Sequence, residues 1–210
     1  MRRSGMAIVL GPLAVLLVVL VAPPAGAATV DVTVSDNFFD PNTSTVHVGD
    51  AVHWSRADGS IRPHTVSANN AFWDTDCNPC AGPIDVTATF SAGTFHYYCK
   101  IHGSPEGVPG EGMNGLISVP VTLGSGPAGL PFTVTWASSS STTGSAYDVQ
   151  FRVGSGKWKT WQGGTEGLKG VFGRGGKPTA LHHGTRYSLR ARSRTADGPS
   201  EWSPSASFKP

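Results

Sequence analysis

Four residues in the first half of the chain have side chains that could together bind a redox-active metal. Cys99 and His102 are separated by two residues in a Cys-x-x-His motif, Met113 follows eleven positions after His102, and His64 lies upstream. A thiolate favours Cu(I) and imidazoles suit Cu(II), and two His with a Cys and a weak axial Met form a blue-copper ligand set. The sequence therefore predicts one copper site made by His64, Cys99, His102 and Met113.

The elements around Cys99 explain how three of these ligands could meet. Residues 95–99 alternate like a strand, so that Phe95, Tyr97 and Cys99 face inward while His96 and Tyr98 share the other face. A loop over residues 100–111 carries His102, and a strand over residues 116–119 follows. A loop between two adjacent strands fixes its ligands at a small cost in chain entropy.

Other short alternating runs predict an all-β fold. Residues 30–34, 45–48 and 84–91 have strand-like patterns, and Val52 and Trp54 alternate with His53 and Ser55. By this alternation His53 points to the surface, as does His47. We expect neither to bind metal, since most histidines are not ligands.

Five motifs give residues 30–121 a resemblance to a plastocyanin-type cupredoxin: residues 38–41, 48–54, 63–66, 97–102 and 112–115. The resemblance implies a Greek-key β-sandwich with one type 1 copper at one end. It implies that His64, Cys99, His102 and Met113 hold the copper. It also implies that His102 marks the exposed edge of the site and that Tyr98 lies on a second electron path.

Two features depart from the family pattern. The interval between His102 and Met113 is longer than in plastocyanins, so Glu106 or Glu111 could take the axial position instead. The residue after the first His is often Asn in the family and is Thr65 here. We therefore expect Thr65 to join the two ligand segments differently, which would alter the second shell.

The N-terminus has the pattern of a cleaved signal peptide over residues 1–27. Arg2 and Arg3 precede an apolar run, and residues 25–27 form a small-x-small cleavage site, so we expect the mature chain to begin at Ala28. An uncleaved membrane anchor is the alternative. Export would place the protein outside the cell or in a periplasm.

Cys77 and Cys80 lie close together in the sequence, which leaves Cys99 as the odd cysteine. In an oxidising compartment the first two are expected to form a disulfide. A redox-active pair is the alternative, although no thioredoxin-like βαβ pattern surrounds it, and a second metal site lacks further ligands nearby.

The predicted domains are a cupredoxin-like domain over residues 28–123, a linker over 124–129 and a second sandwich over 130–210. The second half resembles a fibronectin type III domain. The resemblance rests on the Leu181-x-x-Gly184-Thr185-x-Tyr187 tyrosine corner and on a turn at residues 196–198 that leads into residues 200–203. The first strand of that family is not visible before Phe132, so the domain is either truncated or shares chain with the linker.

Charge divides unevenly between the halves. Residues 28–123 contain ten acidic and three basic side chains, whereas residues 124–210 contain four acidic and eleven basic ones. The arginines 190, 192 and 194 are expected to face outward, and with Trp158, Trp161 and Trp202 they form either a cation–π ladder or a solvated basic face over a tryptophan core. With these opposite charges the halves either dock on one another or each face a separate partner. We expect separate partners, because no apolar surface accompanies the linker to seal an interface.

These features favour a secreted single-electron carrier. Its partners would be a redox protein at the acidic copper domain and an anionic cell-surface polymer at the basic domain. The alternative is a copper scavenger without redox cycling. An enzyme is not expected, because the chain lacks His-x-His pairs and a defensible catalytic arrangement, and nothing indicates nucleic-acid binding.

Overall fold

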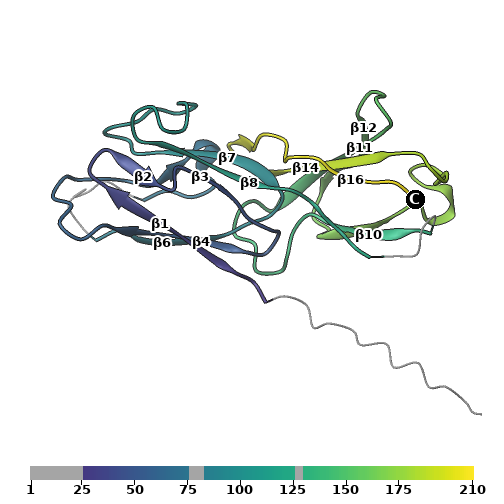
Figure 1. Cartoon of the computed structure of the whole chain (residues 1–210), viewed down its shortest axis with the longest axis horizontal. Helices are drawn as coiled ribbons and strands as arrows, with labels where there is room; N and C mark the ends of the chain where they lie inside the picture. The colour runs from purple at the N-terminus through teal and green to yellow at the C-terminus, as the bar shows by residue number, and fades with distance from the viewer. Residues whose placement is uncertain (1–25, 76–82, 126–129) are drawn as a thin grey trace, which may run out of the picture.

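The computed structural model describes residues 26–75, 83–125 and 130–210. In these residues the chain is all-β and forms two β-sandwiches that lie end to end along the long axis of the molecule (Figure 1). Within the described residues, no helix has the length and apolar character needed to cross a bilayer.

One sheet of the first sandwich has the strand order β2-β1-β4-β6. These strands are β1 (Thr29–Ser35), β2 (Phe38–Asp40), β4 (Ala51–Arg56) and β6 (Asp85–Thr89). β1 pairs in parallel with β4 and antiparallel with β2, and β4 pairs antiparallel with β6. The expected alternation holds, because Val52 and Trp54 are buried while His53 is partly exposed.

The facing sheet has the order β3-β8-β7-β5 and carries the candidate metal ligands. Its strands are β3 (Thr43–Thr45), β5 (Ser67–Ala68), β7 (Gly93–Tyr98) and β8 (Asn114–Val119), and the short turn η1 (Asn69–Ala71) follows β5. The strand expected over residues 45–48 ends at Thr45. Phe95, Tyr97 and Cys99 are buried as predicted, and β7 pairs antiparallel with β8 so that the ligand loop connects neighbouring strands.

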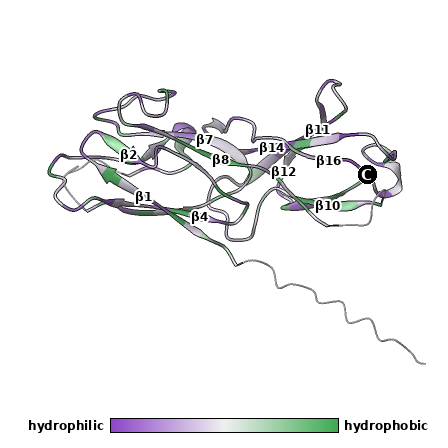
Figure 2. Cartoon of the chain, in the orientation of Figure 1, coloured by the Kyte–Doolittle hydropathy of each residue, from purple (hydrophilic) through white to green (hydrophobic). Residues whose placement is uncertain are grey.

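The second sandwich contains a sheet of order β13-β10-β9 and a larger sheet of order β12-β11-β14-β15, with β16 also paired to β14. The strands are β9 (Thr122–Leu123), β10 (Phe132–Thr135), β11 (Ala146–Val153), β12 (Lys159–Thr165), β13 (Lys169–Phe172), β14 (Tyr187–Thr195), β15 (Gly198–Pro199) and β16 (Ala206–Phe208), with a short turn η2 (Arg174–Gly176) after β13. Figure 2 shows apolar residues on β1 and β10, one strand from each sandwich.

The strand that the sequence could not locate before Phe132 is β9. Thr122 and Leu123 pair antiparallel with β10, and Val121 belongs to the core of the second sandwich. The second sandwich therefore shares chain with the segment that precedes the linker. The tyrosine corner is present as well, since the Tyr187 hydroxyl donates to the Ala180 carbonyl at 3.0 Å.

A cation–π ladder covers the exposed face of the larger sheet. The Arg190 guanidinium lies between two indoles, 4.2 Å from the ring centre of Trp158 and 4.6 Å from that of Trp202. Arg152 stacks on the outer side of the ladder over Trp158, and Arg192 stacks over Trp202. Of the two arrangements that the sequence allowed for this face, the cation–π ladder is therefore the one that these residues form.

Two residues that the sequence associated with this face make other contacts. Trp161 packs edge-to-face against Trp136 and Phe172, with ring centres 5.7 and 5.2 Å away. Arg194 points outward but forms an ion pair with Asp148, with Nε 3.0 Å from Oδ2. The tryptophans therefore divide between the ladder and the core.

Buried hydroxyl groups join the two sandwiches. The Ser91 Oγ lies 2.8 Å from the Thr143 Oγ1 and 2.6 Å from the Ser193 Oγ, which in turn donates to the Ala92 carbonyl at 3.1 Å. Ser91, Thr143 and Ser193 are fully buried. A buried hydroxyl is costly unless it is hydrogen-bonded, so these bonds hold the contact in one arrangement.

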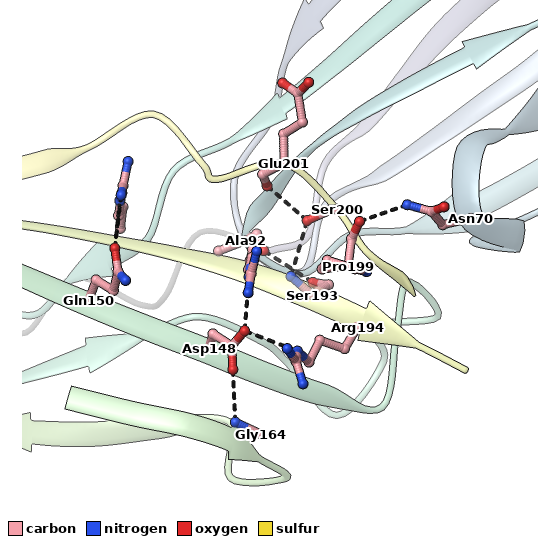
Figure 3. A network of polar contacts seen from close by, with 12 residues as sticks. Asn70, Ala92, Asp148, Gln150, Gly164, Ser193, Arg194, Pro199, Ser200 and Glu201 are labelled. Carbon is pink, nitrogen blue, oxygen red and sulfur yellow. Dashed lines mark hydrogen bonds and ion pairs between the residues drawn. The ribbon is translucent and has the colours of Figure 1, made fainter. Parts of the chain in front are cut away.

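A second set of bonds lies between η1 and β15. The Asn70 side-chain amide donates to the Pro199 carbonyl at 2.7 Å, and the Thr195 hydroxyl donates to the Asn70 carbonyl at 2.8 Å. Figure 3 shows Asn70 reaching toward Pro199, with Ser193 and Ala92 close by. Thr94 and Glu201 exchange two backbone bonds of 3.1 Å.

These contacts correct the expectation that the two halves stay apart. That expectation rested on the lack of an apolar surface beside the linker, but hydroxyl, amide and backbone groups make the junction. The opposite net charges of the two halves do not create this junction. Among the described residues, its ion pair joins His96 to the largely exposed Glu201 at 3.6 Å. We call this set of contacts the seam.

Candidate metal centre

His64, Cys99 and His102 meet at one end of the first sandwich, where one nitrogen or sulfur atom of each lies within 4.8 Å of the others. The Cys99 Sγ is 3.9 Å from the His64 Nδ1 and 3.6 Å from the His102 Nδ1. His64 and Cys99 are buried and His102 is partly exposed. Among the described residues, this is the group of His, Cys, Asp and Glu side chains with the spacing of a metal site.

A tight turn after β7 brings His102 back to Cys99. The amides of His102 and Gly103 donate to the Cys99 carbonyl at 3.2 and 2.8 Å. The Cys99 sulfur also accepts a hydrogen bond from the Thr65 amide at 3.4 Å. The spacing of two residues between Cys99 and His102 is therefore the spacing that one such turn closes.

Asp36 orients the buried imidazole of His64. The His64 Nε2 lies 3.1 Å from the Asp36 Oδ1, so Nε2 is assigned as the protonated nitrogen and Nδ1 keeps its lone pair toward Cys99. Burial lowers the pKa of His64 and favours the neutral ligand form. The hydroxyl of Ser60, the imidazole of His64 and two backbone amides hold the pKa of Asp36 well below its usual range. Sequence reasoning missed Asp36, since a lone Asp in a turn carries no signal for this role.

Thr65 joins the two ligand segments through its hydroxyl and its amide. Its hydroxyl accepts a hydrogen bond from the Lys100 amide at 2.8 Å, while its amide donates to the Cys99 sulfur. Thr65 is fully buried. A hydroxyl at this position therefore provides the connection that an Asn side chain was expected to provide.

Met113 lies at the other end of the ligand loop and is fully buried. Its amide donates to the His102 carbonyl at 3.1 Å, and its carbonyl accepts from the Cys99 amide at 3.0 Å. Its backbone is thus bonded to both neighbouring candidate ligands despite the long interval. The axial role of Met113 stays a prediction.

Asn114 organises the long interval between His102 and Met113. Its side-chain oxygen accepts from the Ser104 amide at 3.0 Å, and its side-chain amide donates to the Glu111 carbonyl. A Cβ at Gly103 or Gly107 would collide with Asn114 or with the adjoining backbone, at 2.4 Å. The extra residues therefore fold over Asn114 and leave Met113 in the core.

The two acids that could have replaced Met113 are exposed and are not part of the ligand group. Glu106 lines a hollow of about 350 Å³ together with Asp74, Tyr98 and Lys100. Within the part of the chain that the structure describes, the carboxylates of Glu106 and Glu111 thus lie outside the site.

The other candidates lie elsewhere or cannot be placed. His53 is bound by the carboxylates of Asp31 and Asp85 at 2.9 and 3.0 Å, as a partly exposed cross-strand contact. The predicted Cys77–Cys80 disulfide falls outside the described residues. Cys99 is a free, buried thiol.

The donor set fits copper on two grounds. One thiolate and two imidazoles suit Cu(I) and Cu(II) together. The two Nδ1 atoms face the sulfur, and the Asp36 carboxylate fixes the tautomer of His64 from the opposite side of its ring. Such outer contacts orient metal-ligating histidines in general.

Comparison with known proteins identifies structures similar to each half, while no protein-family model and no curated protein matches the chain. A mutant fern plastocyanin is 22% identical over 42% of this chain and 98% of its own, with a TM-score of 0.32. A reduced mutant amicyanin is 22% identical over 45% of this chain and 82% of its own, with a TM-score of 0.30.

Two further structures match across both halves. The FN1–FN3 domains of chicken CNTN1 are 14% identical over 71% of this chain and 58% of their own, with a TM-score of 0.32. A cytokine receptor complex is 18% identical over 70% of this chain and 85% of its own, with a TM-score of 0.32. These similarities accompany the all-β architecture described above.

Proposed function

We propose that the protein is a secreted type 1 copper protein that carries single electrons between redox partners. The observation that supports this function is the convergence of His64, Cys99 and His102 at one end of a β-sandwich, with both Nδ1 atoms directed at a buried sulfur. Bound copper would supply one-electron exchange between Cu(I) and Cu(II).

The surrounding residues keep the ligands in one arrangement. Asp36 holds the ring of His64, and Thr65 connects the segment of His64 to that of Cys99 through the Lys100 amide. Both contacts are independent of the oxidation state of a metal. A site preorganised in this way needs little rearrangement when an electron arrives or leaves.

His102 is the candidate ligand through which electrons would pass to a partner. It is partly exposed, whereas the other three candidate ligands are buried. Tyr98 precedes Cys99 and lines the hollow shared with Lys100 and Glu106. This hollow provides a second approach to the copper through the Cys99 backbone.

The test is to load the purified protein with Cu(II) and record its absorption and spin-resonance spectra. We expect intense visible absorption from thiolate-to-Cu(II) charge transfer. Cys99→Ser should abolish this absorption in a protein whose far-ultraviolet circular dichroism is unchanged, and the same absorption in that variant would exclude the site. Voltammetry separates a carrier, with fast reversible exchange, from a scavenger that binds copper without cycling.

We further propose that the arginine ladder of the second sandwich attaches the protein to an anionic cell-surface polymer. Arg152 and Arg190 lack a carboxylate partner among the ion pairs of the described residues, whereas Arg192 and Arg194 share Asp148. Their charges are thus available to a polyanion. Retention of the protein on a sulfated or phosphorylated polymer at low salt, and release at high salt, is the expected behaviour.

A further inference from the structure

The carboxylate of Asp50 is buried beside the start of β1, and among the described residues its ion-pair partner is the imidazole of His47. Asp50 exposes 8% of its surface. Its Oδ1 accepts from the Ala28 amide at 2.9 Å, and its Oδ2 accepts from the His47 amide at 2.8 Å and lies 3.2 Å from the His47 Nδ1. The His47 ring is 85% exposed, and an imidazole carries a charge only when it is protonated. A buried carboxylate normally has an opposite charge nearby.

Ala28 is held against Asp50 by the sheet. Its carbonyl accepts from the Ala51 amide at 2.8 Å, and β1 begins at the next residue and pairs in parallel with β4. Ala28 is also the residue at which the sequence predicts that the mature chain begins. The backbone nitrogen that cleavage would free is therefore the nitrogen that already contacts the buried carboxylate.

We propose that hydrolysis of the peptide bond between Ala27 and Ala28 creates a partly buried ion pair between the new α-ammonium group and Asp50. Water adds across the bond, Ala27 leaves with a carboxyl group, and the Ala28 nitrogen becomes an amino group that takes up a proton. A charged donor then replaces a neutral one, and such hydrogen bonds are about twice as strong. This inference needs the export step of the proposed function but does not depend on copper.

The ion pair would also stabilise the seam. The Asp50 carbonyl accepts from the Phe90 amide at 2.9 Å, and the Phe90 carbonyl accepts from the Ser141 hydroxyl of the second sandwich at 3.1 Å. Val48, in the same turn, packs against the cores of both sandwiches. Removal of the leader therefore strengthens the turn on which the second sandwich rests.

The pH dependence follows from the amino group. An α-amino group has an ordinary pKa of about 7.7–8, and a buried carboxylate partner raises it. The stabilisation is then fully present below the ordinary value and is lost as the pH rises through the raised one. His47 is the titratable side chain that faces Asp50, and its removal in His47→Ala leaves the effect in place.

The experiment uses the full-length chain, exported through its own leader. Mass spectrometry should show that the exported protein begins at Ala28. A second chain carries one threonine inserted between Ala27 and Ala28, with retention of this residue checked by mass. Asp50→Asn is then placed in both chains, and the folding equilibrium constant is measured by urea unfolding below pH 7.

Asp50→Asn should reduce the folding constant about ten-fold more in the chain that starts at Ala28 than in the extended chain, which corresponds to one unit of pKa shift. Asp58→Asn, in an exposed loop, should act equally in both chains. If Asp50→Asn does not fold, the pKa of the Ala28 amino group is measured in the unmutated protein by nuclear magnetic resonance. We expect this pKa to be at least one unit above about 8, the ordinary value. A different N-terminus, an equal effect of Asp50→Asn in both chains, or an ordinary amine pKa would overturn the proposal.

Discussion

Removal of one hydroxyl from the seam should uncouple the two sandwiches. The Ser91 Oγ is fully buried and donates to the Thr143 carbonyl at 2.5 Å. Ser91→Ala removes this bond and the contacts with the Ser193 Oγ and the Thr143 Oγ1. The Ser193 hydroxyl keeps its bond to Ala92, and the Ser91 amide keeps its bond to Thr143, so one buried carbonyl loses its side-chain donor.

An unsatisfied buried acceptor costs about 1–3 kcal/mol. This cost falls on the contact between the halves, because all of the lost bonds cross the seam. In the unaltered protein we therefore expect one cooperative unfolding transition. In Ser91→Ala we expect two separate transitions and a free energy of unfolding that is lower by this amount. Urea unfolding of the metal-free protein, followed by tryptophan fluorescence and by circular dichroism, measures both effects.

Ser207→Ala is the matched control. Ser207 is exposed and its hydroxyl bonds Ser188 at 2.8 Å within the second sandwich. This variant should lose at most about 1 kcal/mol and keep the single transition. Two transitions in the unaltered protein would refute the idea that buried hydroxyls couple the two halves. A Ser91→Ala variant with a single transition and the same loss of unfolding free energy as Ser207→Ala would refute it as well.

Three further changes test the site and the second sandwich. Met113→Leu should keep the visible absorption and raise the reduction potential measured by voltammetry, whereas complete loss of copper would show that Met113 is more than an axial ligand. Burial raises the pKa of Asp148, but the Gly164 amide and the arginine partners outweigh burial and lower it. The stabilisation of the fold by the ionised carboxylate is therefore present above about pH 3.9 and is lost as the pH falls below this value. Asp148→Asn should flatten the acid side of a plot of the free energy of unfolding against pH. Tyr187→Phe should lower the free energy of unfolding by about 0.5–1.5 kcal/mol, because the Ala180 carbonyl loses its donor and the His182 amide loses its acceptor. An unchanged midpoint in urea unfolding would contradict this role of the tyrosine corner.

The sequence predicted those features that depend on alternation or on a local motif. The inward face of Phe95, Tyr97 and Cys99 follows from the two-residue period of a strand, and so does the outward face of Arg190 and Arg192. The meeting of Cys99 with His102 follows from one turn. Each of these features needs only neighbours in the chain.

The features that escaped prediction depend on residues distant in the sequence. Asp36 reaches His64 from the turn after β1, and β9 is only two residues long, too short for a periodic signal. The seam is made by serine and threonine hydroxyls, whose burial no local pattern reveals. The role of Asn114 appears only when the loop after His102 is closed over it.

The seam also has a consequence for the proposed attachment. Because buried bonds fix one sandwich on the other, the arginine ladder and the exposed edge at His102 keep a constant direction relative to each other. Molecules adsorbed through the ladder would share one tilt toward the surface beneath them. Such a layer would behave as an oriented film, in which the tunnelling distance to an approaching partner is set by the shape of the anchor and is the same for every molecule.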